Sequence, residues 1–134
     1  MPVKPNPVMK AMVDGKSDEE ILTTASRFGG PQVVTSSIVL GLADAVGPDA
    51  PDAVVAFVAE DGDASYEQVV RTRGGVATVE PSVGEPDAVY TASFPDLVRV
   101  AAGVLDLPSA LVDGRITLRG DADLARRVMQ TLVE

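Results

Sequence analysis

Residues 85–129 read EPDAVYTASFPDLVRVAAGVLDLPSALVDGRITLRGDADLARRVM. Apolar residues in this stretch recur at alternate positions in some parts and at helical spacing in others. Ser, Pro, Gly and Asp stand where the period changes. The pattern therefore predicts five consecutive elements in the C-terminal half of the chain. They are a strand at 88–92, a helix after Ser93, a short helix from Pro108, a strand at 115–119 and a helix after Asp121.

Two helices and three strands are predicted upstream of this stretch. Ser17 and Glu20 have the spacing of a capping box, so the first helix should begin at Ser17. A second helix is expected at 31–45, with one broad side that is buried or faces a lipid. That side carries Val33, Val34, Ser37, Ile38, Gly41, Leu42 and Ala45. The three strands, separated by Asp-Gly and Gly-Gly turns, are expected at 53–60, 65–73 and 76–80.

These elements predict an α+β fold. Local hairpins make antiparallel strand pairs, so a single five-stranded, mostly antiparallel sheet is expected, with helices packed on one face. The length of 134 residues suits one domain, which we expect at 17–134. Residues 1–16 contain three prolines and are expected to form an extended N-terminal arm.

The composition argues against several classes of function. The formal net charge is −9, from 11 basic and 20 acidic residues, which argues against a nucleic-acid partner. The chain has no His and no Cys, so it lacks the commonest general base, the usual zinc ligands and any thiolate nucleophile. No signal peptide and no apolar run of membrane-spanning length are found, so a cytoplasmic protein is expected.

The remaining polar motifs are interpreted as structural. Asp61 with Asp63, and Asp121 with Asp123, do not continue into a calcium-binding loop, because the sixth position after each start is not Gly. They are interpreted as a hairpin turn and a helix cap. We therefore expect no catalytic residue, no metal and no cofactor.

The chain resembles the sterol carrier protein type 2 family. The resemblance is carried by Pro86-Asp87-Ala88 entering a strand, by residues 93–103, by the Asp113-Gly114 turn and by Gly120-Asp121; it extends more weakly back to residue 53. It implies a hydrophobic tunnel between sheet and helices, and non-catalytic binding of a fatty acid, fatty acyl-CoA or phospholipid. The composition suits a bacterial member, for which a sterol is the less expected ligand. The last residues, Thr131-Leu132-Val133-Glu134, do not form a peroxisomal targeting tail.

The resemblance does not identify single ligand contacts, because the family recognises lipid through an apolar lining. Two arginines, Arg126 and Arg127, are candidates to pair with a lipid head group. An aliphatic core and an aliphatic cavity use the same side chains, so each candidate for the lining also has a purely structural interpretation. The lining candidates are Ile21, Leu22, Phe28, Val98, Ala101, Leu105, Leu111, Leu124, Val128 and Leu132.

Two functional hypotheses follow. The first is a carrier that holds an acyl-type lipid without catalysis and makes transient contact with membranes. The second is a ligand-free dimerisation, regulatory or accessory module with a filled core, in which the N-terminal arm and the last helix contact a second copy. An enzyme that uses only carboxylates or hydroxyls is a weaker idea, because no cluster of such residues supports it.

Overall fold

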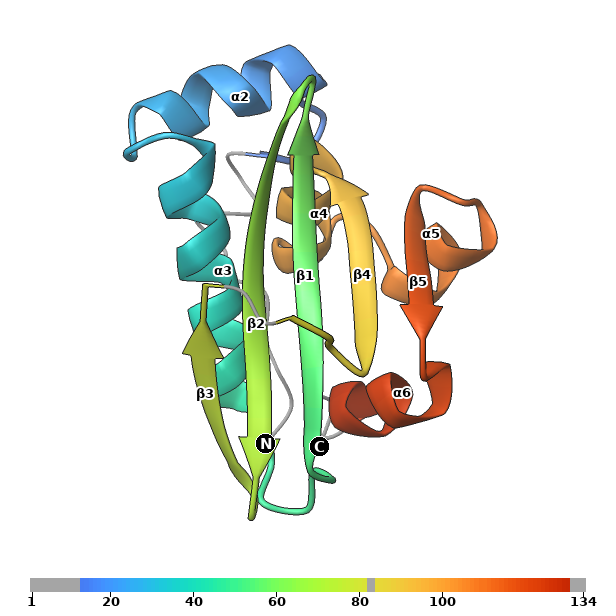
Figure 1. The fold of residues 1–134 in the computed structure, drawn as a ribbon. Helices are drawn as coiled ribbons and strands as arrows, with labels where there is room; N and C mark the ends of the chain where they lie inside the picture. Colours follow the sequence, from blue (N-terminus) through green and yellow to red (C-terminus); the bar gives the residue numbers. More distant parts are fainter. Residues whose placement is uncertain (1–12, 82–83, 131–134) are drawn as a thin grey trace.

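The computed structural model of the chain describes residues 13–81 and 84–130 (Figure 1). The chain runs through two helices, a three-stranded meander, a strand, two helices, a strand and a helix, in the predicted order. These elements are α2 (Asp18–Ser26), α3 (Pro31–Ala45), β1 (Ala53–Asp61), β2 (Ala64–Arg73), β3 (Val76–Glu80), β4 (Ala88–Ser93), α4 (Phe94–Ala101), α5 (Leu107–Val112), β5 (Ile116–Gly120) and α6 (Ala122–Gln130).

The five strands form one sheet in the order β3-β2-β1-β4-β5. β1 pairs with β2, β2 with β3, and β4 with β5 in antiparallel fashion, whereas β4 lies parallel to β1. The predicted five-stranded, mostly antiparallel sheet is therefore confirmed. The connection from β3 to β4 must cross two strands, because β4 joins the sheet on the far side of β1.

The helices cover one face of this sheet, and the core lies between the two layers. Val55, Phe57 and Ala59 of β1 alternate toward the helices and are all buried. Tyr90 and Ala92 of β4 stand opposite Phe57 and Ala59 in the register and share that face. In Figure 1, α3 and α4 lie behind the sheet, and α6 packs at the lower end of β1 and β4.

Short polar side chains cap α2, α4, α5 and α6, whereas α3 begins at Pro31 after Gly30 without a side-chain cap. The Ser17 hydroxyl accepts from the Glu20 amide, and the Ser17 amide donates to the Glu20 carboxylate, both at 3.2 Å. Ser93 caps α4 and Asp121 caps α6 in the same manner. The start of α5 differs from the prediction: it lies at Leu107, one residue before Pro108, because Asp106 supplies its cap.

Asp87 joins three strands at one end of the sheet. Its amide donates to the carbonyl of Val54 at 2.7 Å, and its carboxylate accepts from the Val54 amide at 2.8 Å. Its carbonyl accepts from the Asp121 amide at 2.8 Å, which fixes the end of β5. The Pro86-Asp87-Ala88 motif therefore has a structural role, because Asp87 holds the start of β4 against β1 and β5.

Most of the predicted N-terminal arm, residues 1–12, lies outside the described residues. The four described residues of that segment do not extend: Lys16 donates its amide to the carbonyl of Val13 in a turn. Val13 is buried in the core cluster with Ile21 of α2, so these residues belong to the folded domain. Among the described residues, none of the helices is both long enough and apolar enough to cross a membrane.

Candidate functional site

A cavity of about 320 Å³ lies on the helix-covered side of the sheet. Its walls come from α3, α4, α5, α6 and three strands, so it lies between the two layers of the fold and is partly open. Nearly all of the lining is apolar. The lining residues are Ser37, Ile38, Gly41, Leu42, Phe57, Val58, Tyr90, Ala92, Leu97, Val100, Ala101, Leu107, Ile116 and Met129.

The α3 wall follows from the spacing of its residues. Ser37, Ile38, Gly41 and Leu42 lie on one side because positions four apart are neighbours on a helix. Gly41 is exposed, and a Cβ added there would meet nothing within 4 Å, so the α3 wall is open at this residue. The Ser37 hydroxyl is engaged with its own helix, donating to the carbonyl of Val33 at 3.0 Å. These four belong to the broad side of 31–45 that was expected to be buried or to face a lipid. The prediction was wrong for Val33 of the same side, which is 49% exposed.

Two aromatic rings form part of the cavity floor. Phe57 and Tyr90 are register partners on β1 and β4, and their rings stack at a centroid distance of 5.4 Å. Burial raises the pKa of the Tyr90 hydroxyl, and the positive charge of Arg126 acts in the opposite direction. Tyr90 therefore brings a neutral hydroxyl to a lining in which Ser37 carries the other hydroxyl and the remaining residues are apolar.

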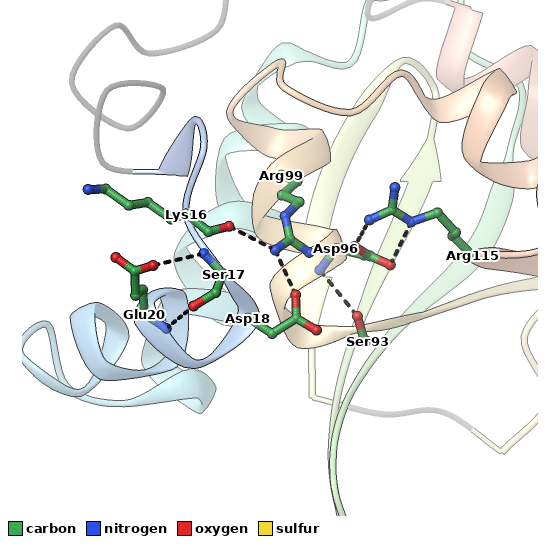
Figure 2. A network of polar contacts seen from close by, with 8 residues as sticks. All are labelled: Lys16, Ser17, Asp18, Glu20, Ser93, Asp96, Arg99 and Arg115. Carbon is green, nitrogen blue, oxygen red and sulfur yellow. Dashed lines mark hydrogen bonds and ion pairs between the residues drawn. The ribbon is translucent and has the colours of Figure 1, made fainter.

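A polar network joins α4 to the start of α2 and to the start of β5 (Figure 2). Asp96 of α4 accepts hydrogen bonds from Arg99 at 2.8 Å and from Arg115 at 2.6 Å and 3.2 Å. Arg99 also pairs with Asp18 at 2.6 Å and donates to the carbonyl of Lys16 at 3.2 Å. The network thus ties the start of α2, α4 and the start of β5 together.

The members of this network are sequence neighbours of lining residues. Asp96 precedes Leu97, Arg99 precedes Val100 and Arg115 precedes Ile116. Burial by itself would raise the pKa of Asp96, but the hydrogen bonds from Arg115 and Arg99 outweigh that effect. The pKa of the Asp96 carboxyl is therefore below its usual value, and that of the Arg115 guanidinium is raised. The network is charged at neutral pH and holds the α4 wall in place.

The structure brings one of the predicted lining residues, Ala101, to the cavity. Ile21, Val98 and Val128 are buried in the core cluster outside the lining, and Phe28 is 58% exposed. Leu132 lies outside the described residues. The others are half-buried against the core: Leu22, Leu105, Leu111 and Leu124.

The difference has a geometric cause. The apolar stripes of α4 and α6 hold both residues that pack only in the core and residues that line the cavity. Val98 and Val128, which were predicted, are of the first kind, whereas Leu97, Val100 and Ala101 of α4 and Met129 of α6 line the cavity. Sequence reasoning also missed Phe57 and Tyr90; their rarity in a chain with 4% aromatic residues is the signal that singles them out.

Both head-group candidates are exposed on α6. Arg126 lies one helical turn before Met129, and its 66% exposed side chain pairs with Asp123 at 3.5 Å. Arg127 is also exposed and lies on a different side of the helix from Met129. Among the residues that the structure describes, no cluster of acidic side chains could hold a metal ion.

Comparison with protein families gives a match over residues 49–133, which is well over half of the chain. The chain belongs to the SCP-2 sterol transfer family. The family model begins just before β1 and includes the whole sheet, α4, α5 and α6. The helices α2 and α3 precede the matched region, although α3 supplies part of the cavity. None of the curated proteins compared with the chain matches it.

Solved structures share this family fold. Sterol carrier protein 2 like 2 from Aedes aegypti is 22% identical with a TM-score of 0.60, over 75% of this chain and 98% of that chain. A solution structure of the palmitated form is 23% identical with a TM-score of 0.58, over 71% and 90%. The sec-alkylsulfatase Pisa1 from Pseudomonas sp. is 27% identical with a TM-score of 0.57, over 70% and 15%. The chain thus spans less than a sixth of the alkylsulfatase.

Proposed function

We propose that this member of the SCP-2 family binds a lipid with a long acyl chain in the cavity between helices and sheet, and carries it without catalysis. The observation that carries the proposal is the apolar cavity of about 320 Å³ between the two layers. Burial of an acyl chain there removes apolar surface from water, which is favourable by about 0.8 kcal/mol for each buried CH₂ group. The walls offer aliphatic contact and few polar groups, which suits binding more than chemistry.

The size of the cavity favours a slender ligand. Pockets for small molecules span about 300–1,000 Å³, and this cavity stands near the lower end of that range. A fatty acid, or the acyl chain of a fatty acyl-CoA or phospholipid, fits such a space better than the rigid ring system of a sterol. The palmitated form of the insect relative supports an acyl ligand for the fold.

Gly41 gives a direct test of the cavity. We expect Gly41→Phe to place a ring in the open space beside the lining and to weaken fatty-acid binding at least about tenfold. The measurement is displacement of a fluorescent fatty acid from delipidated protein, together with mass spectrometry of lipid extracted from the purified protein.

Leu40→Phe is the matched control, since Leu40 is 51% exposed on the same helix and does not line the cavity. It should bind as the wild type does. No co-purifying lipid and no displacement at micromolar fatty acid by the wild-type protein would contradict the proposal.

A second candidate function is an accessory module of a larger assembly. The alkylsulfatase match favours it, because a fold similar to this chain forms a minor part of that protein. In this case the apolar cavity would remain empty, and the chain would act through contact with a partner or with a second copy. Sedimentation with and without fatty acid separates the two functions, because a monomer that retains lipid is expected only of the carrier.

A further inference from the structure

The Tyr90 hydroxyl is a hydrogen-bond donor without a partner among the described residues. Its ring is held in place by the stack on Phe57, so the position of the hydroxyl at the cavity is set by the sheet. The other hydroxyl of the lining, that of Ser37, already donates to a carbonyl of its own helix. Among the described residues the one fully buried side-chain polar atom without a partner is the Thr35 hydroxyl, so the Tyr90 hydroxyl is partly accessible and can donate a hydrogen bond to a ligand in the cavity.

Arg126 of α6 supplies a positive charge. It is one turn from Met129, which lines the cavity, and its charge lowers the pKa of Tyr90 against the larger, opposite effect of burial. Its pair with Asp123 joins two exposed side chains at 3.5 Å, so it is weak and can be exchanged. The apolar stem of Arg126 can lie along the cavity rim while the guanidinium stays near water.

We infer that Tyr90 and Arg126 form a head-group subsite that selects a free carboxylate at the end of a single acyl chain. The inference rests on the proposed lipid-binding function. A carboxylate accepts a hydrogen bond from Tyr90 and pairs with Arg126, and such charge-assisted contacts are stronger than neutral ones. An ester or an alcohol of the same chain length offers no charge for Arg126. The overall charge of −9 repels anions from the rest of the surface, so attraction of a fatty acid must be local.

The test compares palmitate with methyl palmitate and cetyl alcohol, each displacing an uncharged fluorescent probe from delipidated protein. Wild-type protein should bind palmitate about tenfold more tightly than the two neutral lipids. Tyr90→Phe keeps the ring and removes the hydroxyl, and Arg126→Gln removes the charge. Each should weaken palmitate binding about three- to tenfold. Arg126→Gln should leave the methyl ester unchanged, and Tyr90→Phe should weaken the ester less than palmitate, because a neutral ester carbonyl is a weaker acceptor than a carboxylate. The preference of the wild type should shrink as salt is raised, since the Arg126 side chain is exposed.

Arg127→Gln is the matched control, because it removes the same charge from the neighbouring position and should keep the preference for palmitate. Arg126→Lys should restore most of that preference, and thermal unfolding of each variant shows whether it is folded. If the wild type binds none of the three lipids, the proposed function itself fails. If it binds all three equally, or if Tyr90→Phe and Arg126→Gln keep the preference, the head-group subsite is overturned while lipid binding stands.

Discussion

Thr35 is a fully buried residue on α3 whose hydroxyl has no hydrogen-bond partner among the described residues. Its desolvation is therefore not offset by a contact. We expect Thr35→Val, which keeps the shape, to raise the free energy of unfolding by about 1 kcal/mol. Thr35→Ala, which leaves a void, should lower it instead. Urea denaturation of the three proteins measures both, and a Val variant less stable than the wild type would show that the hydroxyl is satisfied.

Gly120 occupies a position that only glycine fits. Its φ is 89°, and a Cβ at this position would clash with the carbonyl oxygen of Asp87. That carbonyl accepts a hydrogen bond from the Asp121 amide, so the two backbone segments lie too close together for a side chain between them. Gly120→Ala should therefore lower the free energy of unfolding by about 2 kcal/mol or more. Gly62→Ala is a useful comparison: it has the same sign of φ but open space around it, and should cost less.

The helix α4 depends on a buried carboxylate for its attachment. Asp96 has a side chain 12% exposed and is bonded to two arginines, so Asp96→Asn should lower the free energy of unfolding at neutral pH by about 2 kcal/mol. The pKa of Asp96 is lowered in the folded protein from an ordinary value of 3.8. Its stabilising contribution is therefore complete above about pH 4 and is lost as the pH falls below that value.

Unfolding curves between pH 7 and pH 2 test this dependence. The difference in stability between wild type and Asp96→Asn should be largest near neutral pH and should shrink in acid. Glu80→Gln is the matched control, since it removes a half-exposed carboxylate from its pair with Arg71 and should change stability by less than about 1 kcal/mol. A difference that stays constant down to pH 2 would contradict the assigned role of the Asp96 charge.

Most boundaries of the helices and strands could be predicted because they depend on neighbours in the sequence. Ser17, Ser93 and Asp121 cap amides three residues ahead, and Gly114 takes a positive φ of 77° after the short helix. The predicted start of α5 was one residue too late, because Asp106 was not recognised as its cap. These are local contacts, so local patterns reveal them.

The lining of the cavity could not be predicted in the same way. An apolar stripe shows which side of α4 or α6 is inward, but whether a residue packs on the sheet or flanks an open space depends on the neighbouring helix. Val98 and Val128 pack in the core, while Leu97, Val100 and Met129 line the cavity. Gly41 contributes by the absence of a side chain, which no hydrophobic pattern records.

The amino-acid sequence by itself determined the order of the elements, their caps and turns, the mostly antiparallel sheet and the resemblance to the family to which the chain belongs. Those features rest on periodicity and on contacts within a few residues. Only the tertiary structure decided that β4 lies beside β1, through contacts of Asp87 with Val54 thirty-three positions away. That pairing stacks Tyr90 on Phe57 and leaves a cavity beneath α3 and α4. The physical reason is that a void is a property of how layers meet, and the same aliphatic side chains fill a core or line a cavity according to that fit.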